Sequence, residues 1–195
     1  MKKTFLFFVL LLLGHLLGSC KKTIAEEPKP AVLVRLIEPN PASLLVKGFA
    51  YMGITNLKVF EFSYEAKNGS FEATNIPILF WVSEKVRDVR DVINSVTLIL
   101  EGDTVALNTP FVYEGYNVCL NFVLNPNGKI VNGKIIKGIL FVNVNRMDEY
   151  IFPSGTRIKI SIDPLKRRPG IIDQNNDSIQ VNGAARGPEI TFVFN

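Results

Sequence analysis

Histidine is almost missing from this sequence, and its absence excludes many kinds of active site. The one histidine, His15, lies inside an apolar run over residues 5–17 near the N-terminus. Ser–His and Cys–His nucleophile pairs need an imidazole, and most catalytic zinc and haem sites use one as a ligand. We expect this run to be removed from the mature protein with a signal peptide. The mature chain then has none of these sites.

A large excess of charge of either sign is also lacking. The chain has 22 Lys and Arg against 18 Asp and Glu, a formal net charge of +4. Without Lys2 and Lys3, which precede the apolar run, 20 basic side chains remain against 18 acidic ones, a net charge of +2. A charge this small gives no electrostatic basis for binding nucleic acid. We therefore expect no nucleic-acid partner.

The N-terminus has the composition of a secretory signal peptide. Two lysines stand before the apolar run, which is thirteen residues long. A helix of that length is too short for a hydrocarbon core of roughly 30 Å. The run also lacks the polar face that a surface helix of a folded domain needs. We therefore expect residues 1–19 to be a signal peptide that is cleaved on export.

The end of this segment resembles the lipobox of bacterial lipoproteins. Leu17-Gly18-Ser19-Cys20 is an apolar residue, two small residues and then a cysteine. The resemblance implies that signal peptidase II cleaves between Ser19 and Cys20 and that Cys20 carries fatty acids. Two or three acyl chains anchor a protein stably in a membrane, where a single chain does not. The membrane is therefore a predicted partner through this anchor.

The residues after Cys20 bear on where the anchored protein lies. Lys21 stands where an aspartate retains lipoproteins of this class in the inner membrane, so the resemblance implies the outer membrane. Glu26 and Glu27 lie too far from the cysteine to act as a surface-export signal, which favours the periplasmic face over the cell surface. Residues 20–30 are polar and contain two prolines, so we expect a flexible tether.

The second cysteine, Cys119, has no partner once Cys20 is acylated. An intramolecular disulfide is then excluded. As a nucleophile Cys119 would need a neighbouring base, and none lies near it in the sequence. We therefore expect a buried, unreactive thiol.

From residue 31 onward the sequence predicts strand after strand. Apolar and polar residues alternate over 55–64, 117–124 and 156–162, which is the period of a strand with one buried face. Turn residues such as Asn68-Gly69 recur every 8–12 residues, a spacing typical of all-β domains. About ten strands are expected. The apolar strand at residues 190–194 should be paired inside a sheet.

A single segment, residues 84–94, has helical character, because Val86, Val89 and Ile93 fall at helical spacing. Its valines are β-branched, so a strand is the alternative. No linker divides residues 31–195. We expect one all-β domain there: a single antiparallel β-sandwich, Ig-like or transthyretin-like, with at most one short helix.

Aromatic residues gather in the first third of the predicted domain, among them Tyr64 and Trp81. We expect most of these rings to form the core. The alternative is an exposed row, including these two residues, that could stack against sugars.

The segment around Asp173, Asn175 and Asp177 has oxygen ligands at alternate positions, as a calcium loop does. Ser178 and Ala184 stand where an EF-hand loop has glycine and glutamate. A polar turn between strands uses the same residues, and apart from this candidate Ca²⁺ no cofactor is expected.

A basic run, Lys166-Arg167-Arg168, precedes Pro169-Gly170. It could contact anionic lipid headgroups or an acidic partner. The alternative is a solvated loop.

These observations predict a membrane-anchored envelope lipoprotein without enzymatic activity. Its domain would bind an envelope protein, as a subunit of a complex, or a glycan. One alternative is a polysaccharide hydrolase that uses two carboxylates, although no spacing singles out a pair. Another is a structural subunit whose edge strand, for example residues 190–194, joins a neighbour's sheet.

Overall fold

The structure is a computed structural model that describes residues 29–37, 43–48, 52–100, 105–111 and 114–194. The predicted signal peptide, the predicted acylation site Cys20 and most of the predicted tether lie outside the described residues. Within the described ranges, no helix is both long and apolar enough to cross a membrane.

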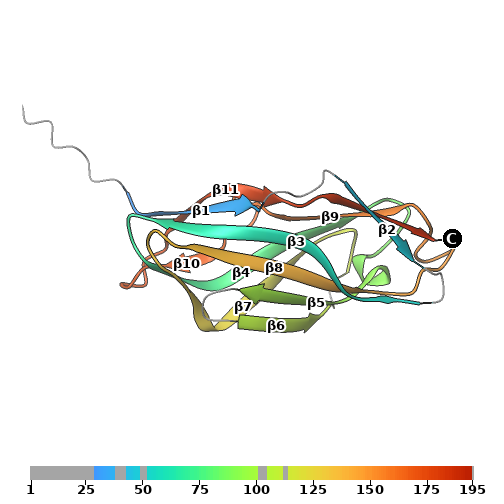
Figure 1. Ribbon diagram of the computed structural model, residues 1–195, viewed down its shortest axis with the longest axis horizontal. Helices are drawn as coiled ribbons and strands as arrows, with labels where there is room; N and C mark the ends of the chain where they lie inside the picture. Colours follow the sequence, from blue (N-terminus) through green and yellow to red (C-terminus); the bar gives the residue numbers. More distant parts are fainter. Residues whose placement is uncertain (1–28, 38–42, 49–51, 101–104, 112–113, 195) are drawn as a thin grey trace, which may run out of the picture.

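The described chain is built almost wholly of strands, so the all-β prediction is confirmed (Figure 1). Within these ranges there are twelve strands and one 3-10 turn, η1. Their bounds are β1 (Ala31–Leu36), β2 (Ser43–Gly48), β3 (Ile54–Lys67), β4 (Phe71–Val82), η1 (Val89–Asp91), β5 (Ile93–Leu100), β6 (Val105–Pro110), β7 (Asn117–Ile130), β8 (Ile135–Val144), β9 (Thr156–Ile162), β10 (Gly170–Ile172), β11 (Gln180–Arg186) and β12 (Glu189–Phe194).

The strands form one mixed sheet, which corrects the expectation of purely antiparallel pairing. A path of hydrogen-bonded neighbours runs β10-β4-β9-β11-β1-β3-β8-β5-β6, with β7 on β4 and with β12 between β9 and β2. Two pairs are parallel, β1 with β11 and β2 with β12. Both join strands from opposite ends of the domain. A hairpin forces antiparallel pairing, whereas a long connection allows either direction, so sequence patterns could not reveal these pairs.

Strand β11 connects two halves of the path. One half is β10-β4-β9 with β7, β12 and β2 attached, and the other is β1-β3-β8-β5-β6. Its residues 180–184 pair with β1, and its last two residues pair with β9. At the crossover Gly183 has a φ of +81°, and a Cβ there would lie 2.5 Å from the carbonyl oxygen of Val34. Only glycine fits this combination of backbone angle and close approach.

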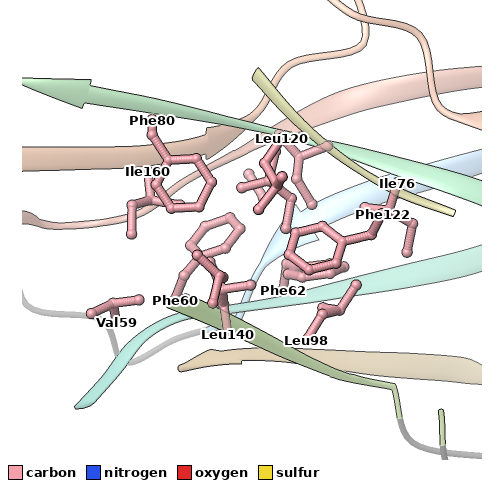
Figure 2. Close-up of a cluster of buried hydrophobic side chains, with 14 of the residues drawn as sticks. Val59, Phe60, Phe62, Ile76, Phe80, Leu98, Leu120, Phe122, Leu140 and Ile160 are labelled. Carbon is pink, nitrogen blue, oxygen red and sulfur yellow. The ribbon is translucent and has the colours of Figure 1, made fainter. Parts of the chain in front are cut away.

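The core lies between the two halves of the path. Figure 2 shows Phe80, Leu120 and Ile160 of β4, β7 and β9 pointing toward side chains of β3, β5 and β8. All of these belong to one continuous cluster of buried apolar side chains. The inward positions expected on β7 and β9 are confirmed: Val118, Leu120, Phe122, Leu124, Ile158, Ile160 and Ile162.

The helical interpretation of residues 84–94 is wrong except for η1. Asp88 caps this single turn by accepting a hydrogen bond from the Arg90 N–H, and Ile93 already begins β5. The helical spacing arose because Val86, Val89 and Ile93 are all buried by an irregular segment that enters a strand. Their β-branched side chains and the pairing of β5 with β8 outweigh a weak helical preference.

Candidate ligand-binding groove

The outer face of β7, β4 and β9 forms the floor of an open groove. Trp81 on β4 pairs with Asn117 on β7 and with Lys159 on β9, which gives one row across three strands. In the next row Leu79 pairs with Cys119 and with Ser161. Neighbouring residues such as Phe80 point inward and are buried. Because side chains alternate along a strand, the two rows face outward.

The segment 163–169 forms one wall of the groove, and the buried Asp163 fixes it. The Oδ1 of Asp163 accepts a hydrogen bond from the Leu165 N–H at 3.1 Å. Its carbonyl oxygen accepts the N–H groups of Lys166 at 3.0 Å and Arg167 at 2.9 Å. The basic run predicted from the sequence is therefore carried on a turn with a defined backbone.

Two hollows lie end to end on this floor. The first has a volume of about 580 Å³, and Trp81, Lys159, Lys166 and Arg186 are among the residues that line it. The second, about 410 Å³, reaches along β4 to Asn75 and along the wall to Arg168. Both hollows share Cys119 and Arg167. We call the two together the β4 groove.

The charge of the β4 groove is strongly one-sided. As far as the described residues go, five basic side chains and one carboxylate line it: Lys159, Lys166, Arg167, Arg168, Arg186 and Asp163. The exposed Arg186 guanidinium lies 3.8 Å from the Asp163 carboxylate. Lys159 donates to Glu189, whose oxygen lies 2.9 Å from its ammonium nitrogen. Among the described residues, Lys166 and Arg167 have no acidic partner.

Glu189 lies beside the groove between two cations. Its carboxylate contacts Lys159 and, at 3.3 Å, Arg157. The hydrogen bond from Lys159 lowers the pKa of Glu189 most, and Arg157 lowers it further. Glu189 therefore neutralises part of the charge on β9 and leaves the basic wall unaffected.

Trp81 is the predicted ligand candidate that the structure places in the groove. It is half-buried, and the Lys159 ammonium lies over its ring, 5.2 Å from the centroid. That arrangement is a cation–π contact. The ring thus stands within the basic floor rather than in the core.

Tyr64, the other candidate, lies in the core, so the hypothesis that it belongs to a solvent-facing row is wrong. Its side chain is 1% exposed and packs edge-on against Phe62, with ring centroids 5.6 Å apart. Burial raises the pKa of the Tyr64 phenol well above its usual value. Its hydroxyl has no hydrogen-bond partner among the described residues. The expectation that most of these rings form the core is confirmed for Phe60, Phe62, Tyr64, Phe71 and Phe80.

The candidate calcium residues form a tight turn after β10. The Oδ1 of Asp173 accepts the N–H of Asn175 at 2.8 Å and the N–H of Asp177 at 2.9 Å. Asp173 also donates its own N–H to the carbonyl of Asp177 at 3.0 Å. These are the bonds of the alternative interpretation, a polar turn between strands. No group of three or more Asp, Glu, Cys or His suited to a metal ion occurs in the described part of the chain.

Cys119 is half-buried at the junction of the two hollows, and its thiol is free. Burial raises the pKa of the thiol, and the nearby charge of Arg167 partly opposes that rise. A raised pKa leaves little thiolate at neutral pH.

Carboxylates are scarce in the groove. Asp163 is the one that lines it within the described ranges, and it is already bonded to the wall and paired with Arg186. Hydrolysis of a glycosidic bond by two carboxylates needs a facing pair. The described groove brings no such pair together.

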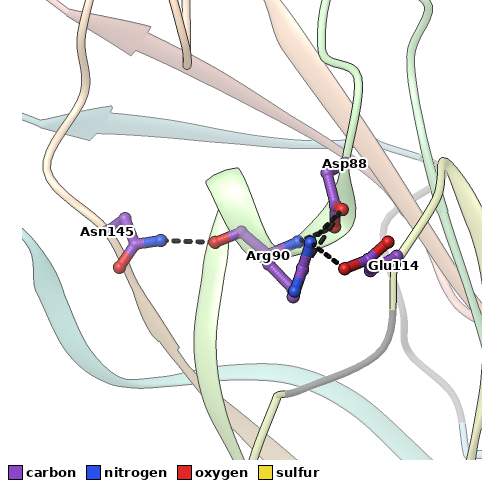
Figure 3. A network of polar contacts seen from close by, with 4 residues as sticks. All are labelled: Asp88, Arg90, Glu114 and Asn145. Carbon is purple, nitrogen blue, oxygen red and sulfur yellow. Dashed lines mark hydrogen bonds and ion pairs between the residues drawn. The ribbon is translucent and has the colours of Figure 1, made fainter.

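A second charged cluster surrounds Arg90, away from any described hollow (Figure 3). The guanidinium contacts Asp88 at 2.9 Å and Glu114 at 3.0 Å. Asn145 donates to the Arg90 carbonyl at 2.7 Å. These charges have partners within the cluster, which ties η1 to the residue segments just before β7 and just after β8.

Sequence reasoning missed part of the groove. Lys159, Asn117 and Arg186 were not singled out, and they join the site only through strand pairing. One signal was available, because strict alternation over 156–162 places Lys159 opposite the inward isoleucines. No signal in the chain links Arg186 to Trp81.

Comparisons with known proteins give no family for this chain. No family model matches it, and no curated protein is similar to it in sequence. Among solved structures, it resembles AvmM, which catalyses macrocyclization in alchivemycin A biosynthesis, with 12% identity and a TM-score of 0.40, over 83% of this chain and 86% of AvmM. It also resembles a chain of the CaDoc0917–CaCohA2 complex, with 12% identity and a TM-score of 0.33, over 83% of this chain and 99% of that one. A third is the major pilin from Streptococcus pyogenes, with 7% identity and a TM-score of 0.23, over 85% of this chain and 48% of the pilin. Structural similarities with TM-scores this low do not support any inference about function.

Proposed function

We propose that this protein is a lipid-anchored envelope protein whose β-domain binds a glycan in the β4 groove without transforming it. Cys20 is its anchor, the outer membrane is its site, and the domain faces the periplasm. In this proposal residues 31–195 are a single β-sandwich, with the two halves of the strand path as its layers. The anchor and location rest on the lipobox resemblance of residues 17–20.

One observation carries the binding function: Trp81 stands in an open groove between amide and basic side chains. The face of an aromatic ring packs against the apolar face of a sugar, while amides and cations bond to its oxygens. Asn117 lies directly beside Trp81 across the strand pair, and Asn121 lies farther along the same face. The groove therefore combines an apolar platform with hydrogen-bonding groups.

The pairing of the last strand bears on the alternative of a structural subunit. Strand β12 pairs with β2 on one edge and with β9 on the other. Both of its edges are therefore occupied over Ile190–Phe192, where it offers no free edge to a neighbour's sheet. The expectation that residues 190–194 are paired inside a sheet is confirmed.

The proposal is tested on the native lipoprotein, captured from crosslinked cells and analysed for bound glycan and protein. We expect a reproducible glycan with the wild-type chain and its loss with Trp81→Ala. Tyr150→Ala is the matched control, because Tyr150 is a 91% exposed aromatic residue outside the groove. A single stoichiometric protein without glycan, unaffected by Trp81→Ala, would contradict the proposal.

A further inference from the structure

We infer that the β4 groove takes an acidic polysaccharide in extended form, with a sugar ring on Trp81 and sugar carboxylates on Lys166 and Arg167. This inference rests on the proposed glycan function and narrows it to a ligand class.

The sign of the ligand charge follows from the unequal distribution of charge on the molecule. Without the predicted signal peptide the chain is nearly neutral, yet among the described residues five basic side chains and one carboxylate line this groove. Such a concentration of cations on one surface attracts anions and speeds their binding. A neutral glycan would gain no such attraction from this positive charge.

Within the groove, Lys166 and Arg167 are the cations available to a ligand. Arg186 faces Asp163, Lys159 contacts Glu189, and Arg168 donates to the carbonyl oxygen of Ile179 at 3.3 Å. Lys166 and Arg167 are exposed, and no described carboxylate contacts either of them. Their backbone is fixed by Asp163, so the two charges are held at the edge of the floor rather than on a loose loop. An arginine in such a place forms paired hydrogen bonds with a carboxylate.

The length of the groove favours a polymer over a single sugar. Outward positions on β4 run from Asn75 in the second hollow to Trp81 in the first. Six residues of a strand span about 20 Å. Arg167 and Cys119 lie where the two hollows meet, so a chain that follows β4 passes both.

The test measures binding of the detergent-solubilised lipoprotein to polygalacturonate and to alginate. Each polymer is compared with its methyl ester, which keeps the backbone and removes the charge. Poly-glutamate serves as a charged polymer without sugar rings. We expect each acidic polysaccharide to bind at least tenfold more tightly than its ester and than poly-glutamate.

The variant Lys166→Gln/Arg167→Gln should weaken binding to the acidic forms about tenfold, since two exposed charge contacts are lost. Lys134→Gln/Lys137→Gln is the matched control, because both lysines are exposed on another surface and the net charge falls equally. We expect no change for the control.

A second measurement locates the ligand. Alkylation of Cys119 by a maleimide is followed by mass spectrometry on the peptide that contains it, at about pH 8 because its pKa is raised. Saturating acidic polymer should slow this reaction at least fivefold. An unchanged rate would place the ligand elsewhere and overturn the inference.

The outcomes separate the inference from the proposed function. Equal binding of acidic and esterified forms, or an unaffected Lys166/Arg167 variant, overturns the acidic ligand and leaves a glycan-binding groove. If poly-glutamate binds as tightly as the acidic polysaccharides, the groove is attracted to charge alone. That result overturns both the inference and the proposed function. If the lipoprotein binds none of the polysaccharides, charged or esterified, the inference and the proposed function are also both overturned.

Discussion

Strands β3 and β4 come from the same aromatic-rich third of the chain, yet their rings lie in opposite environments. On β3 the Phe62 ring contacts the rings of Phe60 and Tyr64 in the core. Figure 2 shows Phe60 and Phe62 among the buried side chains. On β4 the Trp81 ring contacts the ammonium of Lys159 beside an open groove. Strand β3 has β1 and β8 on its two edges, and side chains on both of its faces are buried between residues 59 and 66. Strand β4 buries Phe80 on one face and leaves Trp81 on the other.

Residue type therefore does not decide which aromatic ring is available to a ligand. What decides is whether another part of the fold covers that face of the strand. A ring with ring neighbours contributes to stability, and a ring with charged neighbours at the surface contributes to recognition. The rings of Phe60, Phe62 and Tyr64, which we call the β3 row, should therefore respond to substitution differently from the β4 groove.

The largest effect is expected from Gly138→Ala on β8, the cross-strand neighbour of Phe62. A Cβ at residue 138 would lie 2.2 Å from the Phe62 ring, so the ring must move within a packed core. We expect the free energy of unfolding to fall by about 3 kcal/mol in urea denaturation. Gly128→Ala is the control, because its Cβ would come no closer than 3.3 Å and would meet side-chain atoms. Equal losses in the two variants would contradict the explanation.

Tyr64→Phe should raise the free energy of unfolding by about 1 kcal/mol, because it removes a buried hydroxyl that has no hydrogen-bond partner among the described residues. Thermal or urea denaturation measures the gain, and glycan binding should stay unchanged. Tyr116→Phe is the control, since that side chain is 63% exposed. A loss of stability in Tyr64→Phe would show that the hydroxyl has a favourable contact.

The Glu189 contacts beside the groove should make stability depend on pH. Lys159 and Arg157 lower the pKa of Glu189 in the folded state below its unfolded value. The contribution is therefore present above the unfolded pKa and is lost as pH falls through the folded pKa. Glu189→Gln should cost about 1 kcal/mol near pH 6 and almost nothing near pH 3, by urea denaturation. A cost that is the same at both values would refute the ion-pair explanation.

The smallest effect on stability is expected from Lys166→Gln/Arg167→Gln. Neither side chain has an acidic partner in the described structure, so the free energy of unfolding should change by less than about 0.5 kcal/mol. Urea denaturation is compared with the loss of polysaccharide binding in the same variant. A large loss of stability would mean that these charges support the fold, and the contrast between the β3 row and the groove would fail.

The sequence predicted the strands well and their neighbours poorly. Alternation placed Ile158, Ile160 and Ile162 inward, because a strand's two faces are visible in consecutive residues. The parallel pairs β1–β11 and β2–β12 were missed, since pairing between distant strands leaves no local pattern. The helical spacing at 84–94 misled because irregular backbone can bury the same positions as a helix.

For the candidate site as well, single residues could be predicted from the sequence but their spatial neighbours could not. Trp81 and the run at residues 166–168 were each visible in the sequence, but nothing there placed them in one groove. Tyr64 and Trp81 were equal candidates, and only the cover over β3 separated them.

By itself, the amino-acid sequence determined the all-β class and the inward and outward faces of individual strands, because these depend on residues close together in the chain. The identity of the groove was decided by tertiary structure alone. β4 must lie between β7 and β9 before Asn117, Trp81 and Lys159 form a row, and Asp163 must fold its turn before the basic residues stand beside them. Long-range pairing and charge proximity create that site, and neither is encoded in any short stretch of the chain.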